Sequence, residues 1–148
     1  MKIQAYKGKE WEIGMNKKEK AIELHNKKYN CAQAVACTFC EEIGESEQTL
    51  FKATEGFGLG MGCREGNCGA LTGAIMLAGY KNSDGNTDNP ITKAATYQLS
   101  KAMVATFKEK TGSITCKELK GVETGKVLCS CADCIRAGVE TVEEVLKL

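Results

Sequence analysis

Apolar side chains recur at a helical spacing along much of the chain. In three segments they return every three or four residues, which places them on one face of an α-helix. These stripes are Cys31, Val35, Phe39 and Ile43; Ile91, Ala95, Leu99, Met103 and Phe107; and Leu128, Cys131, Ile135, Val139, Val142 and Leu146. No segment shows a convincing alternation of apolar and polar residues, as a β-strand would. The pattern predicts an all-α protein, a compact single-domain bundle of about six helices with a glycine-rich loop.

Capping residues predict where these helices begin and end. The residues expected to cap helix N-termini are Asn16, Asn30, Ser46, Asn89 and Thr115. Thr115 and Glu118 together fit a capping box. Asn89 is followed by Pro90, a residue favoured at the first helical position. Gly44 should close the helix over residues 31–43, and Gly112 should end the long helix that starts near Pro90.

The first 15 residues show no clear period, and we expect an N-terminal arm over 1–15 followed by one helical cysteine-rich domain over 16–148. Tyr6 and Trp11 suggest that the arm packs onto another surface, and this makes a homodimer plausible.

Composition excludes several classes of protein. The chain has 148 residues, 43% of them apolar and 26% charged, with a net charge of +1. This balance favours neither a nucleic-acid nor a membrane-surface partner. The longest apolar run, around residues 70–80, is too short and too rich in glycine to cross a bilayer. The N-terminus lacks the apolar core of a signal peptide, so we expect a cytoplasmic protein.

Nine cysteines are an unusual number for such a chain. A secreted disulfide scaffold is usually shorter, has an even number of cysteines and carries an export signal. An odd number without a visible signal indicates metal binding or thiol redox chemistry.

The glycine-rich stretch over residues 56–79 carries the strongest chemical signal. It contains Cys63 and Cys68, and Asn67 is expected to cap the helix that follows. Cys68 would then lie in the first helical turn, where unpaired N–H groups and the helix dipole favour a thiolate. We expect the backbone to approach a bound cofactor closely at four glycines, which are Gly58, Gly60, Gly62 and Gly69.

Four cysteines directly follow residues of the kind that cap helices. The pairs are Asn30–Cys31, Asn67–Cys68, Thr115–Cys116 and Ser130–Cys131. If these helix starts converge, they form an electropositive pocket suited to thiolates that hold a metal or an iron–sulfur cluster, or to a reactive cysteine pair.

The remaining candidates have simpler interpretations beside the functional ones. Cys131 and Cys134 form a C-x-x-C spacing that Cys129 could join, although such a pair is also simply one helical turn apart. Cys63 is either a resolving thiol for Cys68 or a loop residue. Cys37 and Cys40 are expected to pack in the core. His25, the single histidine, is expected on the solvated surface.

The order of these motifs resembles a known family. NCAQAV, GFGLGMG with CGALTG, TCKEL and a cysteine-rich start to the last helix are similar to the C_GCAxxG_C_C family, small helical proteins described as redox-active and found mainly in anaerobes. A related segment occurs in split-Soret cytochromes. The resemblance covers roughly Asn30 to the C-terminus. It implies that the family's cysteines are Cys31, Cys68, Cys116 and Cys131, with Cys129 and Cys134 as alternatives for the last.

The preferred hypothesis from the sequence is electron transfer through an iron–sulfur cluster held by Cys31, Cys68, Cys116 and Cys131. The first alternative is cluster-free thiol chemistry, in which Cys68 attacks and Cys63 or Cys31 resolves the disulfide. A structural zinc site of four cysteines is the second. The expected partner is a redox protein or a small thiol or disulfide.

Overall fold

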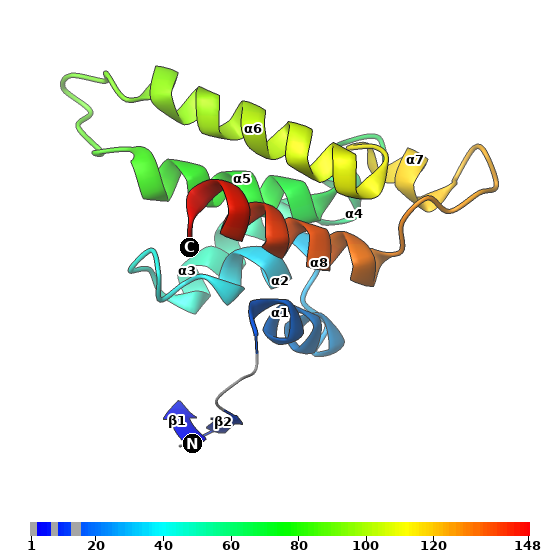
Figure 1. Ribbon diagram of the computed structural model, residues 1–148, viewed down its shortest axis with the longest axis horizontal. Helices are drawn as coiled ribbons and strands as arrows, with labels where there is room; N and C mark the ends of the chain where they lie inside the picture. Colours follow the sequence, from blue (N-terminus) through cyan, green and yellow to red (C-terminus); the bar gives the residue numbers. More distant parts are fainter. Residues whose placement is uncertain (1–2, 7–8, 13–15) are drawn as a thin grey trace.

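The computed structural model (Figure 1) describes residues 3–6, 9–12 and 16–148. Side chains are described from residue 16 onward. Eight α-helices lie in this part of the chain: α1 (Lys17–Asn26), α2 (Cys31–Thr38), α3 (Glu47–Thr54), α4 (Gly58–Met61), α5 (Gly69–Asn82), α6 (Lys93–Thr111), α7 (Cys116–Lys120) and α8 (Cys131–Thr141). A 3₁₀ turn (Glu55–Phe57) precedes α4, and a π-helical turn (Val142–Leu146) continues α8. Six of the α-helices have eight residues or more, so the predicted all-α bundle is confirmed.

A β-hairpin near the N-terminus was not expected. Strand β1 (Ile3–Tyr6) pairs antiparallel with β2 (Lys9–Glu12), and Ile3 lies opposite Glu12. Strands of four residues carry too few side chains for a recognisable alternation, and their pairing depends on backbone groups. The packing expected of Tyr6 and Trp11 concerns side chains outside the described part of the structure.

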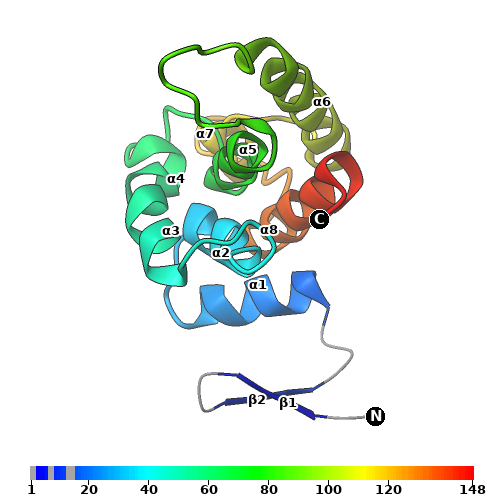
Figure 2. The ribbon, with the colours of Figure 1, turned by 90° about the vertical axis from the view of Figure 1, so that its left-hand side faces the viewer.

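Helix α5 runs through the middle of the bundle (Figure 2). It packs against α2, α6 and α8, while α1 covers α2 and α8 from outside. Its sequence explains this position, because apolar and small residues occur on every side and seven of its fourteen residues are buried. A helix without a polar face is stable only when it is surrounded. No helix in the described part of the chain is long and apolar enough to cross a membrane.

Small residues let the central helices cross closely. A Cβ atom added at Gly73 of α5 would lie 2.5 Å from the carbonyl oxygen of Ala32 in α2. One added at Gly138 of α8 would lie 2.9 Å from the carbonyl oxygen of Ala70 in α5. These crossings place the first residues of α2, α5 and α8 near one another.

Several predicted caps hold, and two helix boundaries differ by three residues or more. The side chains of Asn16, Asn30 and Ser46 accept backbone N–H groups, and Gly112 ends α6 with φ +97°. The start of α6 was predicted at Pro90 but lies at Lys93. The reason is a competing turn, because the side chain of Asn86 accepts the backbone N–H of Asn89.

The second helix is also shorter than predicted, since α2 ends at Thr38 and residues 39–44 form turns. The N–H groups of Phe39 and Cys40 bond to carbonyls only three residues back, those of Ala36 and Cys37. This tightening ends the helix, and it leaves the side chains of Phe39 and Cys40 buried in the core.

Candidate thiol centre

Four cysteines stand at helix N-termini, as the sequence predicts. Cys31, Cys116 and Cys131 are the first residues of α2, α7 and α8, and Cys68 is the N-cap residue of α5. Asn30 caps α2 through a full capping box, and the Ser130 hydroxyl accepts the N–H of Asp133. The backbone N–H groups at such ends favour negative charge, which for these residues means the thiolate.

Two of the predicted caps are wrong in detail. Cys68 itself is the N-cap residue of α5, one position after the predicted Asn67. Asn67 instead forms a β-bridge with Thr115, in which Cys68 N–H donates to Ile114 (2.7 Å) and Cys116 N–H to Gly66 (3.0 Å). The Thr115 hydroxyl donates a hydrogen bond to the Glu118 carboxylate (2.7 Å) and accepts no backbone N–H from α7. The bridge fixes the starts of α5 and α7 beside each other.

The glycine-rich loop lies against these helix starts. A Cβ atom at Gly60, where φ is +59°, would lie 2.4 Å from Cβ of Cys116. Gly58 has the Asn30 side chain at 2.5 Å, and Gly69 has Cβ of Cys31 at 3.4 Å. Gly62 has a positive φ of +78° but nothing within 4 Å of such an atom. Three of the four predicted glycines therefore pack against the starts of α2 and α7, and cofactor binding by them stays a prediction.

Cys68 forms a hydrogen-bonded couple with Cys134. The Cys134 thiol donates to the Cys68 sulfur, and this bond is the main reason that the pKa of Cys68 falls to about 7. Burial opposes the shift, while the N–H groups of Ala70 and Leu71 and the charge of Lys120 support it. The same hydrogen bond and burial raise the pKa of Cys134. Within this couple the thiolate is therefore favoured at Cys68 over Cys134.

Cys31 and Cys131 form a second couple of the same kind. The Cys31 thiol donates to the Cys131 sulfur, which lowers the pKa of Cys131 to about 5 against the effect of burial. Lys120 and His25 contribute to that lower pKa. The bond to Cys131 and burial raise the pKa of Cys31. Because Cys131 is exposed, this thiolate can reach a partner molecule.

Lys120 links the two couples, and sequence reasoning did not identify it. Its Nζ atom lies 3.5 Å from the Cys134 sulfur and 3.2 Å from the carbonyl oxygen of Cys129. Burial by itself lowers the pKa of Lys120, but the charges of Cys134, Cys131 and Cys68 raise it overall. A signal was available, because Lys120 follows Cys116 by four residues and so shares its face of α7.

Cys116 interacts with the charges of the same group of residues. Burial raises the pKa of its thiol, as do the charges of Cys68 and Cys131, while Lys120 and Arg64 act in the opposite direction. Cys129 also belongs to the group, since its side chain hydrogen-bonds with that of Cys134. The structure thus brings together every cysteine at the predicted helix starts, together with both alternatives from the C-terminal segment.

The remaining three thiols belong to neither couple. Cys63 is exposed on the glycine-rich loop, where its thiol is 3.8 Å from the carbonyl oxygen of Gly60. Cys37 and Cys40 are buried in the core as expected, and burial raises the pKa of Cys37 to about 12. His25 differs from its prediction as a solvated residue: it is half-buried, bonds to the carbonyl of Tyr29 (2.9 Å) and acts on Cys131.

All nine cysteines are free thiols in the described residues. No three side chains of Cys, His, Asp or Glu in that part of the chain are grouped closely enough to hold a metal ion as they stand. The chemistry of the donors nevertheless suits an iron–sulfur cluster or zinc, because both prefer thiolate sulfur.

A protein-family comparison identifies the chain from this arrangement of cysteines and glycines. The family model described as "Putative redox-active protein (C_GCAxxG_C_C)" matches residues 29–145. The chain belongs to the C_GCAxxG_C_C family. The match contains all the cysteines of both couples and Lys120, and it confirms the resemblance seen in the sequence. Searches of curated proteins and of solved structures found no match.

Proposed function

We propose that this member of the C_GCAxxG_C_C family is a thiol–disulfide redox protein that uses the couples Cys31–Cys131 and Cys68–Cys134. The observation that carries the proposal is the pairing itself. Each couple joins a thiolate at a helix N-terminus to a thiol that donates a hydrogen bond to it. A nucleophile with a resolving thiol in contact is the arrangement that disulfide exchange requires.

The exposed couple reacts first with a redox partner protein or a small disulfide. The Cys131 thiolate attacks one sulfur of the partner's disulfide, whose S–S bond breaks, and one partner sulfur leaves as a thiolate that takes up a proton. Cys31 then loses its proton and attacks the Cys131 sulfur, which releases the second partner thiol. The partner gains two electrons, and the protein retains a Cys31–Cys131 disulfide.

The electrostatics of the couple support the second step. While Cys131 is a thiolate, its hydrogen bond and its charge hold the pKa of Cys31 high. Once Cys131 is joined to the partner, that charge is gone, and Lys120 still favours the thiolate of Cys31. The resolving thiol becomes nucleophilic only after the first bond has formed.

A redox titration tests this function. The protein is equilibrated without oxygen in buffers of reduced and oxidised dithiothreitol, thiols are alkylated, and disulfides are mapped by mass spectrometry. We expect Cys31–Cys131 and Cys68–Cys134 to form, each as a two-electron transition. Cys63→Ser serves as a matched control and should leave both disulfides unchanged. Absence of both disulfides at every ratio, in protein that remains helical, would contradict the proposal.

An iron–sulfur cluster is the second candidate, because several thiols interact with the charge of the same side chain, Lys120. Cys31, Cys68, Cys131 and either Cys116 or Cys134 would hold it, and it would supply one-electron transfer. A zinc ion bound by the same residues would instead stabilise the fold and carry no electrons. Visible absorption with iron, sulfide and zinc analysis of protein purified without oxygen separates these candidates from the thiol mechanism, which needs a colourless, metal-free protein.

A further inference from the structure

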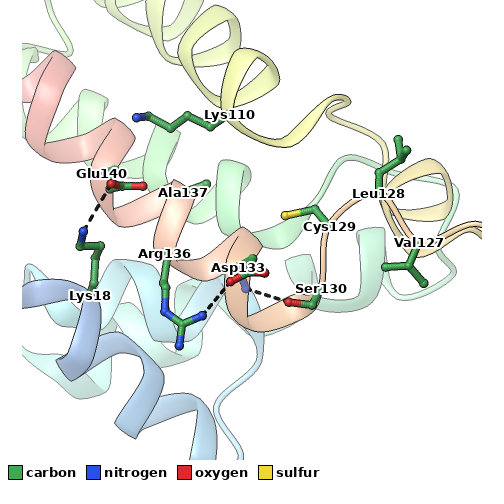
Figure 3. Close-up of a pocket in the computed structure, with 10 residues that line it drawn as sticks. All are labelled: Lys18, Lys110, Val127, Leu128, Cys129, Ser130, Asp133, Arg136, Ala137 and Glu140. Carbon is green, nitrogen blue, oxygen red and sulfur yellow. Dashed lines mark hydrogen bonds and ion pairs between the residues drawn. The ribbon is translucent and has the colours of Figure 1, made fainter.

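A cavity of about 560 Å³ lies beside the thiol centre, between α1, α6, α8 and the segment that leads into α8 (Figure 3). Cavities of this size commonly hold small organic molecules. The residues of its lining that matter here are Lys18, Lys110, Cys129, Asp133, Arg136 and Glu140. Neither the proposed disulfide steps nor the family description accounts for this cavity.

Cys129 connects the cavity with the thiol centre. It is half-buried, and Figure 3 shows its sulfur directed toward the space between the lining residues. Its side chain also hydrogen-bonds with that of Cys134, which itself bonds to Cys68. A continuous row of thiols therefore leads from the cavity to the buried couple.

The lining carries charges of both signs, with three cations (Lys18, Lys110 and Arg136) and two carboxylates (Asp133 and Glu140). Lys18 pairs with Glu140 (3.4 Å), and Arg136 pairs with Asp133 (2.8 Å). The four side chains are 37 to 65% exposed, and ion pairs this exposed contribute little and exchange partners readily. A ligand with both an ammonium and a carboxylate group can therefore take a partner from each pair.

We infer that the cavity binds a zwitterionic disulfide of amino-acid or short-peptide type, and that Cys129 is the thiol that exchanges with it. The inference rests on the proposed thiol–disulfide function and names a substrate class for it. The Cys129 thiolate attacks one ligand sulfur, the ligand's S–S bond breaks, and one half leaves as a thiolate. Cys134 attacks the Cys129 sulfur and releases the second half. The two thiol protons pass to the two halves, and the ligand gains two electrons.

Three small disulfides test the inference on the full-length chain. Cystine carries amino and carboxylate groups, 3,3′-dithiodipropionate lacks the amino groups, and cystamine lacks the carboxylates. The rate of mixed-disulfide formation at Cys129 is measured by tandem mass spectrometry in a Cys134→Ser variant, which cannot resolve it. Exposed Cys63 in the same molecule reports the intrinsic reactivity of each reagent. We expect the ratio of the Cys129 rate to the Cys63 rate to be about tenfold higher for cystine than for the others.

A lining variant and a matched control test the site itself. Arg136→Gln should slow the reaction of cystine at Cys129 about tenfold and leave Cys63 unchanged. Lys101→Gln removes an exposed lysine from α6 more than two turns before Lys110, and it should change neither rate. Should Cys134→Ser fail to fold, the rate at which the unaltered protein releases the thiol from each reagent is compared with that of Cys129→Ser, and the difference between the two rates reports the exchange at Cys129.

Equal Cys129-to-Cys63 ratios for the three reagents, or a cystine rate unaffected by Arg136→Gln, would overturn the inference. Either result would leave the proposed function intact if Cys31–Cys131 and Cys68–Cys134 still form in dithiothreitol buffers. Selective reaction at Cys129 without those two disulfides would instead place the exchange chemistry at Cys129 and refute the proposed couples.

Discussion

The thiol of Cys134, buried within α8, donates a hydrogen bond to the sulfur of Cys68 at the start of α5. A buried thiolate is unfavourable unless several donors surround it. Cys68 has three, because Ala70 and Leu71 add backbone N–H groups to the Cys134 thiol, and the positive charge of Lys120 supports the thiolate further. The relation shows how an otherwise apolar helix crossing can hold a charged sulfur.

The pH dependence of alkylation should identify Cys131 as the most acidic accessible thiol. Its pKa of about 5 lies below that of an ordinary thiol, so the reactive thiolate predominates above that pH and is lost as the pH falls through it. We expect the iodoacetamide rate at Cys131 to be nearly constant from pH 8 to 6 and to fall below about pH 5. Exposed Cys63 is the reference in the same sample.

Replacement of Cys31 should remove the largest cause of that acidity. Cys31→Ala deletes the thiol that donates to Cys131, so the pKa of Cys131 should rise toward the ordinary value of about 8.5. The midpoint of the alkylation profile measures the change. An unchanged midpoint would show that the hydrogen bond does not set the acidity of Cys131.

Lys120→Gln should raise the pKa values of Cys68 and Cys131 together, because the ammonium group favours both thiolates. For Cys68, which titrates near pH 7, a rise of one unit would reduce the thiolate at pH 7 about fivefold. Titration of thiolate ultraviolet absorbance measures the effect. Lys117→Gln is the matched control on α7, since Lys117 pairs with Glu65 and Glu123, and it should leave the titration unchanged.

Two glycines of the loop should respond differently to alanine. Both Gly60 and Gly62 have positive φ, so each substitution carries backbone strain of about 1 kcal/mol. Only at Gly60 would the new Cβ also overlap Cys116. We expect Gly60→Ala to lower the free energy of unfolding by about 1 to 3 kcal/mol more than Gly62→Ala in urea. Equal losses would mean that α7 moves aside freely.

A second pair of substitutions tests the helix crossing. At Gly73 an added Cβ meets the backbone of α2, and Gly73→Ala should lower the free energy of unfolding by about 1 to 3 kcal/mol. Gly79, also in α5, has nothing within 4 Å of such an atom. Gly79→Ala should therefore raise the free energy of unfolding by about 0.5 to 1 kcal/mol, since alanine favours a helix. Chemical denaturation of both variants provides the measurement.

Local features were predicted well from the sequence. The apolar stripes and the caps at Asn16, Asn30 and Ser46 depend on residues within one or two turns of each other. Where another contact competed with the predicted cap, the prediction was wrong. Asn86 holds Asn89 in a turn and delays α6, and the bridge at Thr115 moves the cap of α5 from Asn67 to Cys68.

The partners within the thiol centre could not be predicted in the same way. The C-x-x-C spacing suggested that Cys131 and Cys134 act together, but each of them bonds to a cysteine from another helix. Similarly, the sequence predicts a solvated His25 on a polar helix. In the structure α1 packs on α8, and His25 then interacts electrostatically with Cys131.

The sequence by itself determined the helices of this protein and the placing of its cysteines at their N-termini, because helical period and capping act over a few residues. Only the tertiary structure decided which thiols meet and that Lys120 lies between them. Those contacts depend on how closely α2, α5 and α8 cross, and the distance is set by Gly73 and Gly138 against backbone from distant parts of the chain. Packing between segments far apart in sequence leaves no periodic pattern, so no local signal reveals which thiols meet.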